Sequence, residues 1–178
     1  CTTPPVVTTG SNSPICAGST LNLTASGGTA YAWTGPNGFT SASQNPSISN
    51  ATTAASGVYT VTVTSGTCTA TGTVTATVNA LPSITGTLTV CAGLTTQLSG
   101  SGAPAAVNPW VSATPAVATV NSTGLVTGVT AGTSVITYTN SNGCIRTATV
   151  TVNALPTITG TLSVCAGLTT QLTGSASP

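Results

Sequence analysis

Apolar and polar residues alternate along several stretches of the chain with a period of two residues. In 58–64 (VYTVTVT), valine and tyrosine alternate with threonine. The same alternation recurs in 73–78 (TVTATV) and 147–152 (TATVTV). Because successive side chains of a strand point to opposite faces, each stretch predicts a half-buried β-strand whose outer face is coated with threonine. No segment shows the 3.6-residue period of a helix.

Turn residues separate these short strands at close intervals. Asn142-Gly143 lies between two of them, and because both residue types tolerate a positive φ, the pair predicts a tight hairpin. Short strands with closely spaced turns are typical of β-sandwiches. We therefore predict an all-β fold.

A long segment occurs twice in the chain. Residues 82–104 (PSITGTLTVCAGLTTQLSGSGAP) and 156–178 (PTITGTLSVCAGLTTQLTGSASP) differ at five positions, and NALP introduces each copy. A period near 75 residues predicts tandem domains at 1–80 and 81–154 and an incomplete third repeat at 155–178. Two strands cannot bury a core alone. We expect a longer array to complete this third repeat, with another molecule as the alternative.

Arg146 is the only charged side chain, since the chain has no Asp, Glu, His or Lys. General acid–base catalysis, Ca²⁺ or Mg²⁺ binding and nucleic-acid binding depend on those residue types. No CxxC pair suggests zinc. We therefore predict no enzyme activity, no catalytic residue, no metal and no cofactor. No apolar run reaches the ~18 residues of a membrane helix. A surface this poor in charge has no electrostatic barrier to self-association.

Two resemblances accompany this pattern. Residues 117–139 (VATVNSTGLVTGVTAGTSVITYT), with Trp110 upstream, resemble the group 2 bacterial immunoglobulin-like domain. Residues 30–39 (AYAWTGPNGF) and 56–63 (SGVYTVTV) resemble the immunoglobulin-like or PKD-like repeats of large secreted Bacteroidetes proteins. The resemblances imply tandem immunoglobulin-like sandwiches in cell-surface fibres, adhesins or spacer stalks. They also imply the core residues Trp33, Tyr59, Trp110 and Tyr138.

The six spread cysteines indicate disulfides and an oxidising, extracellular location. One interpretation pairs Cys16 with Cys68 and Cys91 with Cys144, one bridge per domain, and leaves Cys1 and Cys165 for neighbouring repeats or chains. In immunoglobulin wiring, however, Cys16 would lie near the A–B turn and Cys68 near the F–G turn. These two turns are at opposite ends of a sandwich, further apart than the ~7 Å Cα limit for a bridge. The alternative therefore joins Cys16 to Cys144 and Cys1 to Cys68, which would staple domains together. Both pairings stay open at this stage.

The threonine faces also allow more than one interpretation. They are expected to be neutral solvent-facing surfaces, with O-glycosylation or ice binding as alternatives. Asn22, Asn50 and Asn121 begin Asn-x-Ser/Thr sequons and are possible glycosylation sites. The two Trp residues are expected in the core rather than as carbohydrate-stacking platforms. Arg146 is expected on the inward face near a strand end, with its head group in water.

The hypothesis that follows is a structural, extracellular repeat protein that forms a stalk or filament and associates with copies of itself. The alternative is a binding module that recognises carbohydrate or a surface protein through end loops. Its best candidate is the loop-like stretch 34–47 (TGPNGFTSASQNPS). We expect no nucleic-acid partner and no insertion into a membrane.

Overall fold

The computed structural model describes residues 3–175, and every regular element in this range is a β-strand apart from two short 3-10 turns. The predicted all-β class is confirmed. The chain divides into two compact units, Cys1–Leu81 and Pro82–Pro178. The segment predicted as an incomplete third repeat falls within the second unit.

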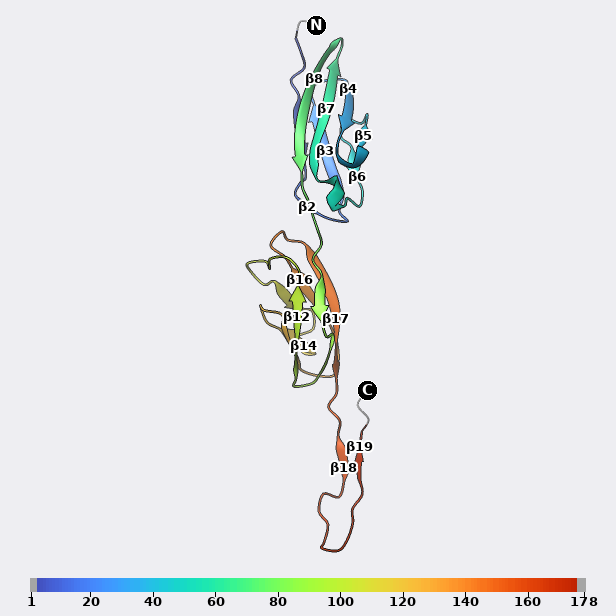
Figure 1. The fold of residues 1–178 in the computed structure, drawn as a ribbon, viewed down its shortest axis with the longest axis vertical. Coiled ribbons are helices and arrows are strands. Elements are labelled where there is room, and N and C mark those ends of the chain that lie inside the picture. The colour runs from blue at the N-terminus through green and yellow to red at the C-terminus, as the bar shows by residue number, and fades with distance from the viewer. Residues whose placement is uncertain (1–2, 176–178) are drawn as a thin grey trace. The chain divides into compact units, whose positions relative to one another are not determined.

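The first unit is a sandwich of two antiparallel sheets with a short parallel pair beside them (Figure 1). One sheet has the order β1-β3-β6, the other has the order β5-β4-β7-β8, and β2 pairs in parallel with β9. The bounds are β1 (Thr8–Ser11), β2 (Ile15–Cys16), β3 (Leu21–Ser26), β4 (Ala30–Thr34), β5 (Thr40–Ser41), β6 (Ser47–Ile48), β7 (Gly57–Ser65), β8 (Cys68–Ala76) and β9 (Val78–Asn79). The 3-10 turns are η1 (Pro36–Gly38) and η2 (Thr53–Ala55).

Alternation along the strands builds the core of this unit. Leu21, Leu23 and Ala25 of β3 are buried, while the residues between them are exposed. On the facing sheet, β7 buries Tyr59, Val61 and Val63 in the same way. These residues form one cluster with Trp33 of β4, so the two sheets meet through their apolar faces.

The second unit repeats the two-sheet plan. Its sheets have the orders β10-β12-β15-β14 and β11-β17-β16-β13, and in the second of these β11 pairs in parallel with the end of β17. The bounds are β10 (Ile84–Gly86), β11 (Thr89–Cys91), β12 (Thr95–Gly100), β13 (Trp110–Ser112), β14 (Ala118–Val120), β15 (Leu125–Gly128), β16 (Gly132–Thr139) and β17 (Ile145–Asn153). Its core cluster is Val90, Leu98, Trp110, Ala118, Val126, Ile136, Tyr138, Val150 and Val152.

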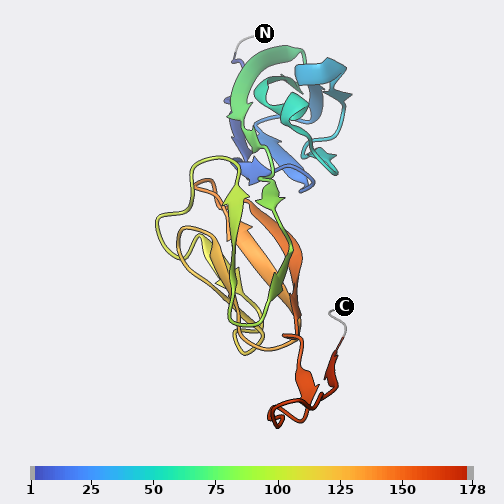
Figure 2. The same cartoon turned by 60° about the horizontal axis from the view of Figure 1, so that its bottom comes forward.

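Residues after β17 form a separate two-stranded sheet, β18 (Ile158–Gly160) with β19 (Leu172–Gly174), seen near the C-terminal end of the chain in Figure 2. The segment that contains β18 and β19 has nearly the same sequence as the segment that contains β10, β11 and β12, but the surroundings of the two segments differ. Leu98 is fully buried, whereas its counterpart Leu172 is 42% exposed. Burial here depends on the strands that complete the sandwich, and not on the local sequence.

The hairpin at Asn142-Gly143 differs in one detail from the expected turn. Gly143 has a positive φ of 75°, but Asn142 is not among the residues with positive φ. The side chain of Asn140 explains the difference, because its Oδ1 accepts hydrogen bonds from the backbone N–H groups of Asn142 (3.1 Å) and Cys144 (3.0 Å). A longer loop closed by a single left-handed glycine replaces the two-residue turn.

Candidate functional site

The outer face of the β7–β8 pair is a continuous surface of threonine. Three cross-strand Thr–Thr pairs lie in register: Thr60 with Thr73, Thr62 with Thr71, and Thr64 with Thr69. Directly opposed β-branched side chains support one another, so these pairs stabilise the sheet as well as coat it. The threonines of β8 are exposed and those of β7 are half-buried.

A similar face covers the β16–β17 pair of the second unit. Thr133 faces Thr151 and Thr137 faces Thr147, while between them Val135 faces Thr149. Val135 is 41% exposed, so this face contains some apolar surface among its hydroxyl groups. Neither threonine face contains an acid or a base, because the chain's one charged residue lies elsewhere.

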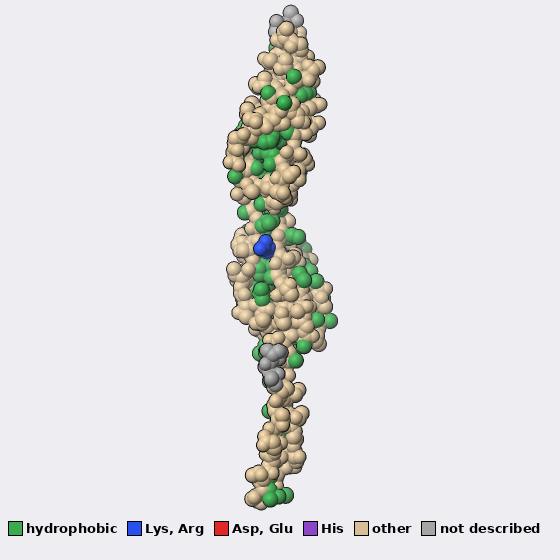
Figure 3. Space-filling model, turned by 90° about the vertical axis from the view of Figure 1, so that its right-hand side faces the viewer, with side chains coloured by type: hydrophobic (Ala, Val, Ile, Leu, Met, Phe, Trp, Pro, Cys, Tyr) green, Lys and Arg blue, Asp and Glu red, His purple; other side chains and the backbone are tan. Residues whose placement is uncertain are grey.

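Arg146 lies on the opposite, inward side of β17, at the open end of the sheet. It stands opposite Tyr138 in the strand register and is exposed, so its head group reaches water. Figure 3 shows a single blue side chain on a surface otherwise made of uncharged polar groups, backbone and scattered apolar groups. The surface thus offers hydroxyl and amide hydrogen bonds and apolar contact, with one positive charge.

The two cysteine positions of the second unit lie at opposite ends of its strand β17. In the second unit, Cys144 directly precedes β17, while Cys91 stands beside Asn153, the last residue of β17. Nine residues of extended strand span about 30 Å, and a disulfide requires Cα atoms within ~7 Å. The proposed pairing of Cys91 with Cys144 is therefore wrong, and Cys91 has a free thiol in this structure.

The same geometry separates the cysteines of the first unit. Cys68 begins β8, whereas Cys16 stands beside Asn79 at the end of β9. Eleven residues of extended chain place them more than 30 Å apart, so a Cys16–Cys68 bridge is excluded as well.

The described cysteines differ in redox state. Cys16, Cys68 and Cys144 are disulfide-bonded, whereas Cys91 and Cys165 are free thiols. Cys1 lies outside the described residues. The bonded cysteines support the expectation of an oxidising environment. Among residues 3–175, no cluster of Cys, His, Asp or Glu could hold a metal ion.

The four aromatic residues expected in the core are buried, and each has a defined partner. The Trp33 indole N–H donates to the carbonyl of Gln44 at 3.3 Å. The Tyr59 hydroxyl donates to the carbonyl of Ala55 at 2.7 Å, as in a tyrosine corner, and burial raises the pKa of this phenol. The aromatic pair of the second unit, Trp110 and Tyr138, has ring centroids 4.6 Å apart.

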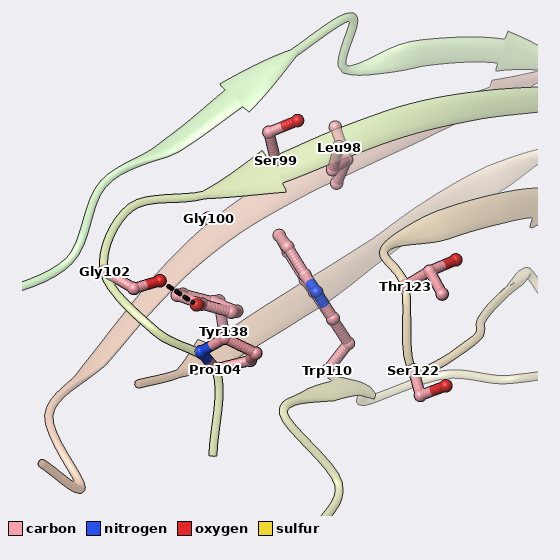
Figure 4. Close-up of a pocket in the computed structure, with 9 residues that line it drawn as sticks. All are labelled: Leu98, Ser99, Gly100, Gly102, Pro104, Trp110, Ser122, Thr123 and Tyr138. Atoms are coloured by element: carbon pink, nitrogen blue, oxygen red, sulfur yellow. Dashed lines mark hydrogen bonds between the residues drawn. The ribbon is translucent and has the colours of Figure 1, made fainter. Parts of the chain in front are cut away.

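An open groove of about 360 Å³ lies beside this aromatic pair in the second unit (Figure 4). Its floor includes the Tyr138 ring, whose hydroxyl donates to the Gly102 carbonyl at 3.0 Å. A Cβ on Gly100 would collide with the Tyr138 ring, so glycine is needed for the ring to lie against β12. Trp110 is only 7% exposed, so it presents little of its surface and acts mainly as a core residue. The groove is lined by Leu98, Ser99, Gly100, Gly102, Pro104, Trp110, Ser122, Thr123 and Tyr138.

A second hollow of similar volume adjoins Trp110. It is lined by Asn108, Trp110, Val111, Ser112, Pro115, Thr119 and Val120. Both hollows offer neutral hydroxyl, amide and backbone groups, so they suit an uncharged polar ligand. The sequence alone does not predict these hollows, because they depend on glycines and loops packed around the Trp110 and Tyr138 rings.

The loop-like stretch 34–47 is held in place by the strands beside it. The Gln44 side-chain amide donates to the Ala25 carbonyl at 2.9 Å, and Asn45 Oδ1 accepts from the Ala25 N–H at 3.1 Å. Phe39 packs edge-on against Tyr59, with ring centroids 5.4 Å apart. This stretch is therefore a structured connection that contributes to the packing of the first unit.

The three sequon asparagines are exposed. Asn22 lies on the outer side of β3, and Asn50 occupies a turn with a positive φ of 50°. Asn121 uses its Oδ1 to accept hydrogen bonds from the Thr123 N–H and hydroxyl and from the Leu125 N–H. All three positions are accessible to modification, and glycosylation at them stays a prediction.

Comparison with known families gives one match, which lies in the second unit. Residues 82–152 match the bacterial Ig-like domain (group 2). The match lies within the second unit and covers less than half of the chain, so this part of the chain is similar to that family. The match includes the stretch 117–139 and Trp110, which carried the resemblance. The PKD-like resemblance of the first unit stays a prediction.

Solved structures with similar folds are also immunoglobulin-like. A C-terminal fragment of intimin, solved in complex with the intimin-binding domain of the translocated intimin receptor, has a TM-score of 0.57 at 17% identity over 89% of this chain and 67% of the fragment. The N-terminal eight Ig domains of the Down syndrome cell adhesion molecule have a TM-score of 0.50 at 14% identity over 85% of this chain and 25% of that one. At these identities the likeness shows the fold alone.

The chain spans 44%, 47% and 25% of the first three solved chains it matches. A comparison with curated proteins finds no match. Within the described residues, no helix is long and apolar enough to cross a membrane. An Ig-like fold is consistent with extracellular adhesion or a structural repeat role, and Ig-like families are typically non-enzymatic.

Proposed function

We propose that this chain is a shaft segment of an extracellular stalk or filament, built from tandem immunoglobulin-like sandwiches that associate with copies of themselves. The observation that carries the proposal is the pair of uncharged threonine faces on two sandwiches of a chain with a single charged residue. The function is mechanical and requires no catalytic group.

Charge repulsion normally keeps the surfaces of soluble proteins apart. Soluble domains carry many charges, and their repulsion opposes association at high concentration. Here that repulsion is nearly absent, while threonine hydroxyls and methyls offer hydrogen bonds and close packing. Exposed valines, such as Val135 and Val111 in the second unit, add apolar contact area on the same sheet. Association through these faces would depend little on salt, because it has almost no charge to screen.

Negative-stain microscopy of the native material tests the proposal. We expect elongated or laterally bundled particles whose fraction rises with protein concentration. Monodisperse single particles at the highest concentration attainable would contradict self-association.

A binding module is the second candidate, because the groove at Trp110 offers a defined site. Its neutral lining would suit carbohydrate hydroxyls or an uncharged peptide, and Ser122 and Thr123 form an accessible rim. A glycan array that compares the wild type with Ser122→Trp, which would block the groove, tests whether the groove binds carbohydrate. Ser43→Trp, at an exposed site in the other unit, is the matched control. Binding that survives the first substitution would argue against the groove.

A further inference from the structure

Strand β17 of the second sandwich has a partner along only part of one edge. On one side, β16 pairs with β17 in an unbroken register from Ile145 to Val152. On the other side, β11 pairs only with residues 151–153. Among the described residues, no strand pairs with residues 145–150 on that second side. We call the β11 side of residues 145–150 the open edge of β17.

The free backbone groups of the open edge belong to alternate residues. In an antiparallel pair, successive residues direct their N–H and C=O groups in turn toward the partner strand and away from it. The Thr151 N–H donates to the Leu88 carbonyl at 2.9 Å, so the backbone groups of Thr151 point away from β16. By the same alternation, those of Thr149, Thr147 and Ile145 point away from β16 as well. A row of unpaired groups of this kind is a template for a further strand.

The sequence of β17 does little else to discourage such pairing. The strand contains neither proline nor glycine, and its register with β16 has no bulge. Its exposed residues include Ile145, which is 55% exposed, and the β-branched Thr147 and Thr149. Proteins commonly protect such edges with a proline, a bulge, a covering segment or a charge. Of these devices, the open edge has the charge, because Arg146 lies within it.

Arg146 points toward the side of the sheet on which a second strand would have to cover it. It stands opposite Tyr138 in the register, on the core side of β17, and its side chain is exposed at the open edge. An inward-pointing charge on an edge strand opposes pairing, because a neighbouring strand would take the charged group out of water. The one charged residue of the chain therefore lies where it protects an unpaired strand edge.

The first unit protects the corresponding strand in another way. In β8, Ala70 occupies the place that Arg146 has in β17, two residues after the cysteine. The edge of β8 is partly covered by β1, whose Thr9 hydroxyl donates to the Thr73 carbonyl at 2.7 Å. Ile84 takes the place of Thr9 in the register of the second unit and has no hydroxyl to donate. A charge is thus present at the edge that lacks this contact.

We propose that Arg146 is a gatekeeper residue that keeps the open edge of β17 from pairing with the same edge of a second copy of this chain. In a two-fold antiparallel pair centred on Thr147, Ile145 of each copy would lie opposite Thr149 of the other, and every free group named above would gain a partner. Arg146 would lie opposite Ala148 of the second copy and diagonally across from the second Arg146. The two like charges would then be close together and partly removed from water, which opposes the pair.

The inference goes beyond the proposed function and does not rest on it. It concerns the backbone edge of one strand, whereas the proposed association uses the threonine faces. Association through those faces leaves the amides of the open edge unpaired, so amide exchange distinguishes the two surfaces.

Sedimentation velocity and amide hydrogen exchange of the full chain test the proposal. Arg146→Ala introduces the residue that the first unit has at this place, and Arg146→Lys is the matched control that keeps the charge. We expect Arg146→Ala to associate at a concentration at least about tenfold lower than the wild type and Arg146→Lys. In the associated state, peptides that contain Thr147 and Thr149 should exchange more slowly in Arg146→Ala alone.

A second substitution blocks the edge by another route. Because the Thr147 N–H points away from β16, Thr147→Pro removes a donor of the open edge without removing a bond to β16. Arg146→Ala combined with Thr147→Pro should therefore associate like the wild type. Should this double variant fail to fold, the two single variants still decide the matter. Equal association of Arg146→Ala and Arg146→Lys, or association of Arg146→Ala without slower exchange at residues 145–149, would overturn the proposal.

Discussion

Leucine-to-alanine substitution at the two copies of one sequence separates the effect of tertiary burial from that of local sequence. Leu98 and Leu172 each end the stretch GLTTQL, but Leu98 is fully buried and Leu172 is 42% exposed. Truncating a buried leucine costs about 2–5 kcal/mol, whereas changes at exposed positions usually stay within about 0.5 kcal/mol. A domain of some 70 residues has only about 4–10 kcal/mol of stability, so Leu98→Ala should remove about a fifth of it or more.

Urea unfolding followed by tryptophan fluorescence measures the difference. Trp110 reports on the second unit and Trp33 on the first, because each lies in its own core. With a slope near 1–2 kcal/mol/M, the transition of the second unit should move by at least about 1 M in Leu98→Ala. Leu172→Ala should leave both transitions in place. Equal shifts in the two variants would refute the reasoning, since burial would then not decide the cost.

Three further predictions follow from single contacts and from charge. Tyr59→Phe should destabilise the first unit by about 1–3 kcal/mol, because the buried carbonyl of Ala55 would lose its hydrogen-bond donor. Thermal unfolding measures this loss, and an unchanged unfolding midpoint would contradict the prediction. The free energy of unfolding should stay flat from about pH 5 to 8, and a change near pH 6 would contradict this. Because burial raises the pKa of Tyr59, the contribution of this tyrosine to stability is complete below about pH 10 and is lost as pH rises through its higher folded-state pKa. Trypsin should cut the denatured, unreduced chain at Arg146 alone, and the fragment with Cys165 should separate without reductant; co-migration would show a bond at that cysteine.

Strand identity and threonine faces were predictable because alternation is a local property. The stretches 58–64 and 147–152 lie in β7 and β17, and their threonines face outward because the alternate residues fill the core. The turn at Asn142-Gly143 was predicted only in part. Local preference allows positive φ at both residues, but the side chain of Asn140 stabilises a different loop.

Disulfide pairing could not be decided from cysteine spacing. One bridge per domain is the simplest arrangement of Cys16, Cys68, Cys91 and Cys144 along the sequence. The register of Cys91 with Asn153 overturns it, because that contact places Cys91 at the far end of the strand that begins after Cys144. Strand pairing between residues 62 positions apart is a tertiary property, and the groove at Trp110 depends in the same way on Gly100 and Gly124 packing against aromatic rings.

Sedimentation velocity at rising protein concentration tests self-association through the threonine faces most directly. Thr71→Lys with Thr149→Lys puts one charge on each face, and Ser43→Lys with Ala116→Lys adds the same charge at exposed positions elsewhere. We expect the wild type and the second pair to associate as concentration rises, and the first pair to remain monomeric until salt screens its charges. Association of the first pair to the same extent as the wild type, or a wild type that stays monomeric throughout, would contradict the proposed function.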